Sequence, residues 1–398
     1  MRLSATTMRA AAAAAVLCLG VSGVTAADKA PLKIGVPTDL SSTYADLGNQ
    51  VIRAVEFAIE EANKSGGVDG RKVEYKSYDT EAKPDIARRQ AEKLVLEGYP
   101  ILLGLIASGE GLAIAPMQER WGSMYISTIN KADALTGAEC QPRVFRLNTQ
   151  SEQDNLTIKP WLEKRKERKW AVVAVDIAWG RSSGEGFTKT VESVGGKVVT
   201  AQYTPSNTND FAPFIQQVKD SGAEAVWIVL SGRDAINFAQ QAKQFGLSDK
   251  VTMAGVSFTT DNAVKSLGDV SKGIYGIINY SASLDTPENK AFVAKWKAKY
   301  NTLPTNFEGE TYIGMQILLQ AVKAAGSTDP VEIGKAMAGK QFDTILGKLT
   351  VRKEDHQLMK PNYFGEVAMY QGELRPVITM QATAQQVAPP VTCKNPNM

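Results

Sequence analysis

The residues that could do chemistry point to binding rather than to catalysis. The sequence has one histidine, His356, which lies in a hydrophilic stretch that we expect to be a solvated loop. It contains neither a Cys/His cluster with zinc-site spacing nor a P-loop for phosphate. Acidic residues are plentiful, but no pair stands out as a general acid and base. We therefore expect no catalytic residue, no metal site and no cofactor.

Small and polar residues instead follow two neighbouring strands. A hydrophobic strand over 101–106 runs into the turn 107–109, where a helix should begin, and a strand over 123–128 runs into 129–131. Because the carboxyl ends of consecutive parallel strands meet at one sheet edge, these two loops should lie together. A helix N-terminus offers unpaired N–H groups to an anionic ligand group, and Lys131 would lie beside it.

Aromatic side chains occur in loops that would face the same region. They are Tyr44, Trp179, Phe258 and Phe307. Aromatic residues suit the walls of an apolar pocket in which a few polar groups fix the orientation of a ligand. Each could instead be a packing residue, but their common placement at strand and loop ends favours a pocket.

The elements that must position these residues alternate between strand and helix over most of the chain. Strands separated by helices indicate parallel sheets with right-handed crossovers. The helices are predicted over 49–64, 84–97, 184–194 and 234–245, among others. One such series occupies 32–147 and a second occupies 151–254, before helices over 287–300 and 308–325 and a β-rich end. The length of 398 residues fits two lobes of ordinary size. The expected fold is therefore α/β with two lobes.

The amino terminus predicts export. Arg2 and Arg9 precede an apolar, Ala-rich run, and small residues at 24–26 suit a signal peptidase. We expect a signal peptide over 1–26, cleaved after Ala26, and a periplasmic protein. Cys18 follows the large residue Leu17, which argues against a lipoprotein. The chain has 45 basic and 42 acidic residues, a balance that argues against a nucleic-acid partner or a membrane surface.

Two cysteines remain after removal of the signal peptide, Cys140 and Cys393. In an exported protein a pair is most simply one disulfide, which would tie down the polar tail 381–398. Two unpaired buried thiols are the alternative.

Seven segments occur in the order of a known family: 33–48, 63–74, 78–87, 104–116, 145–153, 175–187 and 309–316. With them the chain resembles the periplasmic solute-binding proteins of the Leu/Ile/Val type, which serve ABC importers. The resemblance implies the type I periplasmic binding fold, with two Rossmann-like lobes joined by three hinge crossings. Lobe one would comprise 28–148 plus 280–356, and lobe two 149–279 plus 357–380. The hinges would lie near 147–151, 278–282 and 355–361.

The resemblance also implies the ligand site. Ser108 would hold a ligand carboxylate, and 129–131 would form the segment that clasps carboxylate and ammonium in amino-acid binders. Ser231 takes the place of a family tyrosine, with Arg233 close by. The predicted ligand-binding residues are Tyr44, Ser108, Gly109, Ile129, Asn130, Lys131, Trp179, Ser231, Arg233, Val256, Phe258 and Phe307.

Two departures from the family pattern bear on the ligand. Lys131 replaces a small hydroxylated residue, and Val256 replaces the acid that pairs with an α-ammonium. A buried like-charge contact without compensation costs several kcal/mol, so we expect a carboxylate ligand without a free α-amino group. Aromatic or aliphatic organic acids fit, and the segment 136–142 with the Cys393 tail resembles the paired cysteines of relatives proposed to carry aromatic acids. Alternatively, Lys131 points to solvent and Glu308 or Asp39 takes the ammonium of an amino acid.

The sequence thus favours a non-enzymatic, monomeric binding protein that hands a small carboxylate to the membrane permease subunits of an ABC importer. An amino-acid binder is the alternative within this class. A ligand-binding sensor that delivers to a receptor is the alternative from another class, and an exported hydrolase or dehydrogenase is disfavoured.

Overall fold

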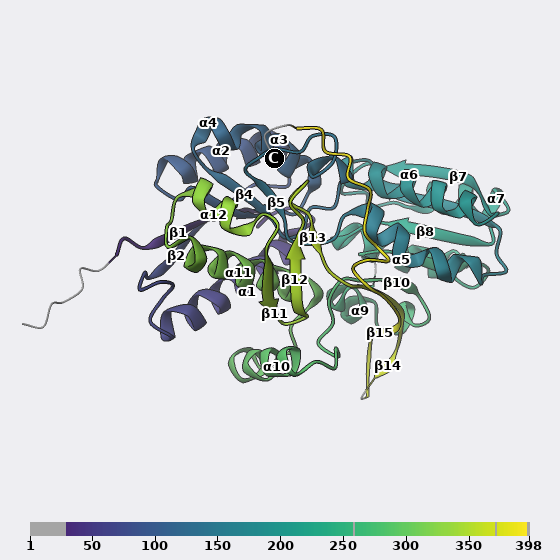
Figure 1. The fold of residues 1–398 in the computed structure, drawn as a ribbon. Coiled ribbons are helices and arrows are strands. Elements are labelled where there is room, and N and C mark those ends of the chain that lie inside the picture. The colour runs from purple at the N-terminus through teal and green to yellow at the C-terminus, as the bar shows by residue number, and fades with distance from the viewer. Residues whose placement is uncertain (1–28, 258, 371, 396–398) are drawn as a thin grey trace, which may run out of the picture.

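A computed structural model of the protein describes residues 29–257, 259–370 and 372–395. The predicted signal peptide and Phe258 lie outside these residues. The described chain forms two α/β lobes that lie side by side (Figure 1), as the sequence predicted.

The first lobe is built on a five-stranded parallel sheet in the order β2-β1-β3-β4-β5. Its strands are β1 (Leu32–Thr38), β2 (Val73–Asp79), β3 (Ile101–Gly104), β4 (Met124–Ser127) and β5 (Val144–Arg146). The helices of this lobe are α1 (Ala45–Lys64), α2 (Pro84–Leu96), α3 (Ser108–Ile114), α4 (Gln118–Trp121), α10 (Pro287–Tyr300), α11 (Asn306–Ala325) and α12 (Pro330–Met337). The inner strands β3 and β4 are buried throughout, as expected for a parallel sheet covered by helices on both faces. A small antiparallel sheet, β11 (Gln341–Thr344), β12 (Gly347–Val351) and β13 (Leu358–Met359), adds to the same core.

The second lobe is built on a seven-stranded sheet in the order β15-β14-β10-β9-β8-β6-β7. Its strands are β6 (Lys169–Val175), β7 (Lys197–Thr204), β8 (Ala225–Val229), β9 (Thr252–Val256), β10 (Tyr275–Ile278), β14 (Asn362–Tyr370) and β15 (Glu373–Ala382). Its helices are α5 (Ser151–Glu163), α6 (Ala178–Ser193), α7 (Ala212–Asp220), α8 (Gly232–Gln244) and α9 (Asp261–Leu267). The sheet is parallel except for β14 and β15, an antiparallel hairpin added at the β10 edge.

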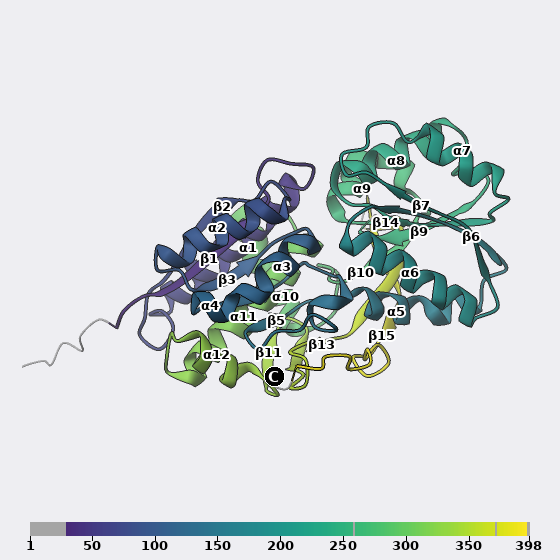
Figure 2. The same cartoon turned by 90° about the horizontal axis from the view of Figure 1, so that it is seen from above.

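The chain passes between the lobes three times, from β5 to α5, from β10 to α10 and from β13 to β14 (Figure 2). Leu358, within the segment expected to form the third hinge, packs in the core of the first lobe.

Two helices begin a full turn or more before the residue at which the sequence predicted them to begin. α1 begins at Ala45 instead of 49, and α6 begins at Ala178 instead of 184. In both cases the first turn holds glycine or polar residues that obscure the helical period, while one large side chain, Leu47 or Trp179, is buried. The helix expected to begin at 107–109 is interrupted by a 3-10 turn over Ala115–Met117, which contains Pro116.

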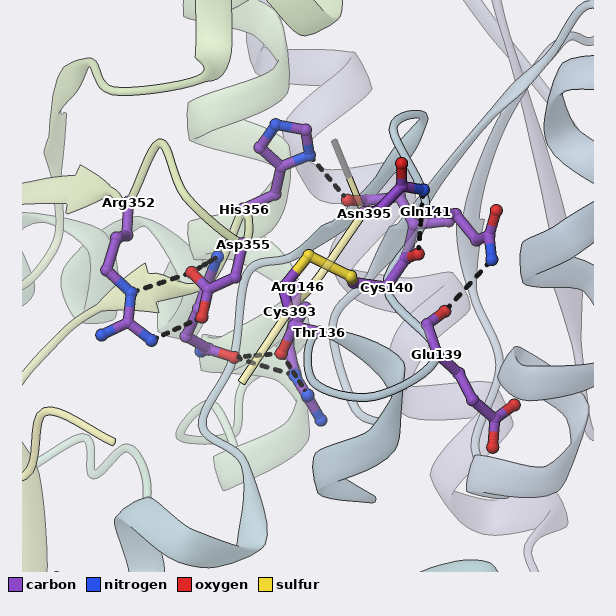
Figure 3. The surroundings of a disulfide bond; sticks show 12 residues. Thr136, Glu139, Cys140, Gln141, Arg146, Arg352, Asp355, His356, Cys393 and Asn395 are labelled. Atoms are coloured by element: carbon purple, nitrogen blue, oxygen red, sulfur yellow. Dashed lines mark hydrogen bonds and ion pairs between the residues drawn. A yellow bond between two sulfur atoms is a disulfide. The ribbon is translucent and has the colours of Figure 1, made fainter. Parts of the chain in front are cut away.

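The C-terminal tail returns from the second lobe to the first and is tied there by the disulfide Cys140–Cys393, across a sequence separation of 253 (Figure 3). The disulfide expected from the sequence is thus confirmed. The Asn395 side chain donates to the Cys140 carbonyl, and Arg352 Nη1 donates to the Pro389 carbonyl at 2.8 Å.

His356 lies near this disulfide and is buried, so the expectation that it is a solvated loop residue is wrong (Figure 3). Its ring stacks on Phe145 with centroids 4.0 Å apart, and its Nδ1 lies 3.1 Å from the Val144 carbonyl oxygen. Burial lowers the pKa of the imidazole. The residues around His356 in the sequence are hydrophilic and suggested exposure, but His356 itself packs the third crossing onto β5.

Among the helices of the described residues, none combines the length and the apolar character needed to cross a membrane.

Candidate functional site

A pocket lies between the two lobes, at the carboxyl ends of strands from both sheets. The first lobe supplies its floor and one wall, and loops after β6, β8 and β9 of the second lobe supply the opposite wall. The lining residues are Tyr44, Leu47, Ile106, Ala107, Ser108, Ile129, Lys131, Ile177, Trp179, Ser231, Ser257 and Phe307. The lining is mainly apolar with a few polar groups, which suits a small organic ligand.

Most of the residues predicted from the sequence line this pocket. They are Tyr44, Ser108, Ile129, Lys131, Trp179, Ser231 and Phe307. The structure therefore brings together side chains that are up to 263 positions apart in the chain, because both sheets direct their strand ends to the space between the lobes.

Ser108 is the polar anchor of the pocket. Its Oγ accepts hydrogen bonds from the N–H groups of Lys131 and Ala132, both at 3.1 Å. A hydroxyl has two acceptor lone pairs and one donor hydrogen. With both lone pairs used, the hydrogen of Ser108 is left to donate to a ligand.

Two other predicted residues support the pocket from outside its lining. Asn130 Nδ2 donates to the carbonyls of Leu105 and Ile106, at 3.3 and 3.0 Å, and so fixes the loop between β3 and α3. Gly109 lies in the first turn of α3, where an added Cβ would lie 3.4 Å from the Pro84 side chain. Neither Asn130 nor Gly109 lines the pocket.

Two predicted residues of the second lobe are not part of the pocket lining. Arg233 is exposed, and Val256 is fully buried in the core of its lobe. Ser257, the next residue, lines the pocket instead and has a positive φ of 57°. Phe258 lies outside the described residues.

Lys131 lines the pocket, but its charge is not directed at a ligand as the sequence suggested. Its ammonium group forms a buried ion pair with Asp154 at 2.6 Å and does not point to solvent either. We expected this ammonium to face the ligand, and that expectation is wrong. Asp154 compensates its charge.

The two acids considered as partners for a ligand ammonium are also engaged. Asp39 Oδ1 accepts from the N–H groups of Ser41 and Ser42, at 3.2 and 2.9 Å. Glu308 accepts from Arg53 Nε at 2.7 Å and caps α11 through the Thr305 N–H. The lining, as far as the described residues define it, contains no carboxylate.

Two buried donors of the pocket lack partners. The Tyr44 hydroxyl and the Trp179 indole N–H make no hydrogen bond to any described residue, although Ser206 lies near the hydroxyl. Tyr44 and Trp179 are only 4% and 7% exposed. An unpaired buried donor costs about 1–3 kcal/mol, so an acceptor on a ligand would relieve both residues.

Sequence reasoning missed Leu47, Ile106, Ala107, Ile177 and Ser257. Ala107 was recognised as a turn residue and Ile177 is the second residue after β6, so the strand-end signal that found their neighbours could have included both. Leu47 was missed because α1 was expected to begin after it.

Two of the contacts between the lobes involve α6 and the start of α8. Ser182 Oγ in α6 donates to Asp133 Oδ2 in the first lobe at 2.6 Å. Gly232 approaches the loop before α1 so closely that an added Cβ would lie 2.4 Å from the Thr43 carbonyl oxygen. The structure therefore shows an arrangement in which the pocket is enclosed.

The segment 180–184, GRSSG, has the spacing of a hydrolase nucleophile elbow. Both of its serines lie inside α6 rather than at a strand-to-helix turn, and Ser182 is bonded to Asp133. The geometry is that of a helix and an interlobe contact, not of an activated nucleophile.

Glu110 lies in α3, two residues after Ser108, and we expect it to make the stability of the protein depend on pH. Its Oε2 accepts from the Ala107 N–H at 2.9 Å, and burial raises its pKa from 4.5 to about 7, with Asp39 adding to the rise. Because the folded state holds this proton more tightly than the unfolded chain, stability that is fully present below pH 4.5 is lost as the pH rises through 7. The Glu110→Gln variant should lose this component of the pH dependence, on the order of 3 kcal/mol.

Urea unfolding of the parent and the variant across this pH range measures the effect. Asp234, whose pKa burial raises to about 6, titrates in both proteins and cancels in the comparison. Equal pH slopes for the two proteins would show that folding does not shift the pKa of Glu110.

Two α/β lobes that enclose a pocket at facing strand ends define a solute-binding protein. The profile of the periplasmic binding protein family matches residues 31–373, and the chain belongs to this family. The resemblance to the Leu/Ile/Val type is confirmed, and the protein is an extracytoplasmic solute-binding protein of the ABC-importer type.

Relatives and solved structures agree with this assignment. The Leu/Ile/Val-binding protein homolog 6 of Brucella melitensis is 27% identical over 344 residues, which cover 85% of this chain and 87% of the relative. A solute-binding protein of an ABC transporter from Rhodopseudomonas palustris BisB5, in complex with 3,4-dihydroxybenzoic acid, is 25% identical with a TM-score of 0.82, covering 89% and 98% of the two chains. Another from R. palustris, in complex with benzoate, is 26% identical with a TM-score of 0.82, covering 92% and 100%.

Proposed function

We propose that the protein captures a small aromatic or aliphatic carboxylate that lacks a free α-amino group. It would deliver this ligand in the periplasm, as a non-enzymatic monomer, to the membrane subunits of an ABC importer. The observation that carries the proposal is the lining itself: apolar walls, hydroxyl and indole donors, and no carboxylate among the described lining residues.

The donors fit a carboxylate ligand with an apolar body. The Ser108 hydroxyl, the Tyr44 hydroxyl and the Trp179 indole would donate to ligand oxygens. Hydrogen bonds to an ionised group are worth about 1.5–3 kcal/mol each. An α-ammonium would in contrast lose its hydration without gaining an acid partner, which costs several kcal/mol. The two R. palustris proteins in complex with benzoate and 3,4-dihydroxybenzoic acid support an aromatic acid.

A branched-chain amino acid is the second candidate, and the names of the Brucella relatives favour it. Isocaproate and leucine test the two candidates directly, because they differ only in the α-ammonium group. Hydrocinnamate and phenylalanine form the corresponding aromatic pair, and benzoate completes the panel.

Thermal unfolding of the mature protein, refolded to remove carried-over ligand, should show a shift of about 3 °C with a saturating carboxylate. The amino acid of each pair should give no shift. A shift with leucine that exceeds the shift with isocaproate would overturn the proposal in favour of amino-acid transport.

The Tyr44→Phe variant tests whether the Tyr44 hydroxyl donates to the ligand, and Tyr125→Phe is its matched control. Tyr44→Phe removes an unpaired buried hydroxyl, so the ligand-free protein should be as stable as the parent or more stable, while carboxylate affinity falls. Tyr125→Phe removes a hydroxyl that is bonded to Asn130 and should instead destabilise the ligand-free protein.

A further inference from the structure

Lys131 lies where the pocket meets the crossings between the lobes, and its main chain contacts both lobes. Its N–H donates to Ser108 Oγ at 3.1 Å. Its carbonyl oxygen accepts from the N–H and the hydroxyl of Ser151, the first residue of α5, at 2.8 and 2.9 Å. The main chain of Lys131 therefore joins the anchor of the pocket to the second lobe.

The side chain of Lys131 binds groups from the first two crossings. Its Nζ donates to Thr149 Oγ1 at 2.9 Å, to Asn279 Oδ1 at 2.9 Å and to Asp154 Oδ2 at 2.6 Å. Thr149 belongs to the first crossing, Asn279 to the second, and Asp154 to α5. An ammonium group has three donor hydrogens, so all of them are used in this buried position.

The third crossing joins the same network. Asn362 Nδ2 donates to Asp154 Oδ1 at 2.9 Å, and Asn279 Nδ2 donates to Asn362 Oδ1 at 2.8 Å. Lys360 Nζ donates to the Asn279 carbonyl at 2.8 Å. Each crossing thus contributes to one buried group of residues, here named the hinge cluster: Lys131, Thr149, Asp154, Asn279, Lys360 and Asn362.

We propose that Lys131 is a positioning residue that sets the angle between the lobes and thereby the affinity of the pocket. Rotation about the crossings would move Asp154, in the second lobe, relative to Lys131, in the first. A buried charge that loses its partners is strongly unfavourable. The hinge cluster therefore favours the arrangement in which the pocket is enclosed. The inference rests on the proposed function only in treating the pocket as a ligand site.

The test uses the double variant Lys131→Met with Asp154→Asn in the full mature chain. It removes both charges together and keeps an oxygen that can accept from Asn279 and Asn362, so the fold should be retained. Nitroxide labels at Leu96→Cys and Phe245→Cys, exposed positions in the first and second lobes, report the interlobe distance by pulsed EPR without any ligand. In the double variant we expect a wider and displaced distance distribution and roughly tenfold weaker binding of benzoate.

A matched control removes an exposed ion pair of the same type, with Lys243→Met and Asp249→Asn, and should change neither readout. The single variant Asn362→Ser keeps the Lys131 ion pair but removes one of the donors to Asp154 Oδ1, which still accepts from Asn279 Nδ2 at 3.1 Å. It should widen the distance distribution to a smaller extent, and it tests the inference if the double variant does not fold.

Unchanged label distances in variants that retain the parent's unfolding midpoint would overturn the inference and leave Lys131 with a purely structural role. Failure of the parent to bind benzoate would count against the proposed function instead. The ligand-free label distances would still decide whether the hinge cluster sets the lobe angle.

Discussion

The Gly232→Ala variant should bind its carboxylate ligand about 5- to 150-fold more weakly than the parent, the range that corresponds to an overpacking cost of about 1–3 kcal/mol. Gly232 lies at the start of α8 in the second lobe, and its added Cβ would lie 2.4 Å from the Thr43 carbonyl oxygen and 3.2 Å from the Tyr44 ring. Both neighbours belong to the first lobe. The clash therefore exists only when the lobes are together, so it lowers the population that can hold a ligand.

Gly246 provides the control for backbone strain. It follows the same helix and has a φ of 68°, close to the 58° of Gly232. An added Cβ at Gly246 would meet no atom of the described chain within 4 Å. Gly246→Ala should thus lose a similar amount of stability from its positive φ while retaining full affinity. Calorimetric titration and thermal unfolding of both variants separate the two effects, and equal affinities would show that Gly232 does not limit closure.

The position of the pocket was predictable from the sequence because it depends on strand ends. The apolar runs before Ser108 and Ile129 mark buried parallel strands, and parallel strands deliver their carboxyl ends to one edge. Trp179 was identified for the same reason, although its helix was expected to begin later. Local sequence patterns contain this information, and the structure confirms the fold that follows from it.

The direction of single side chains was not predictable in the same way. Lys131 finds its partners in Asp154 and Asn279, which are 23 and 148 positions away, and no local pattern brings these residues together. At the end of β9 the strand continues to Val256, whose side chain packs in the core. Val256 was assigned to the site by the family pattern alone, whereas the structure places the next residue, Ser257, in the lining.

Removal of the disulfide should lower the free energy of unfolding by about 3–5 kcal/mol, the effect expected when a very long loop is no longer closed in the unfolded chain. Cys140 belongs to the first lobe, whereas Cys393 follows β15 of the second lobe. The bond is therefore a fourth covalent connection between the lobes. Because the loop that it closes spans 253 positions, the bond restricts most of the chain in the unfolded state.

The double variant Cys140→Ser with Cys393→Ser, compared with the oxidised parent by urea unfolding, measures this effect. The reduced parent should match the double variant, which separates loss of the covalent bond from the change of side chain. Val387 is fully buried and Arg352 holds the Pro389 carbonyl, so part of the tail should stay in place without the bond. A difference below about 1 kcal/mol would mean that such contacts, rather than loop closure, dominate the attachment of the tail.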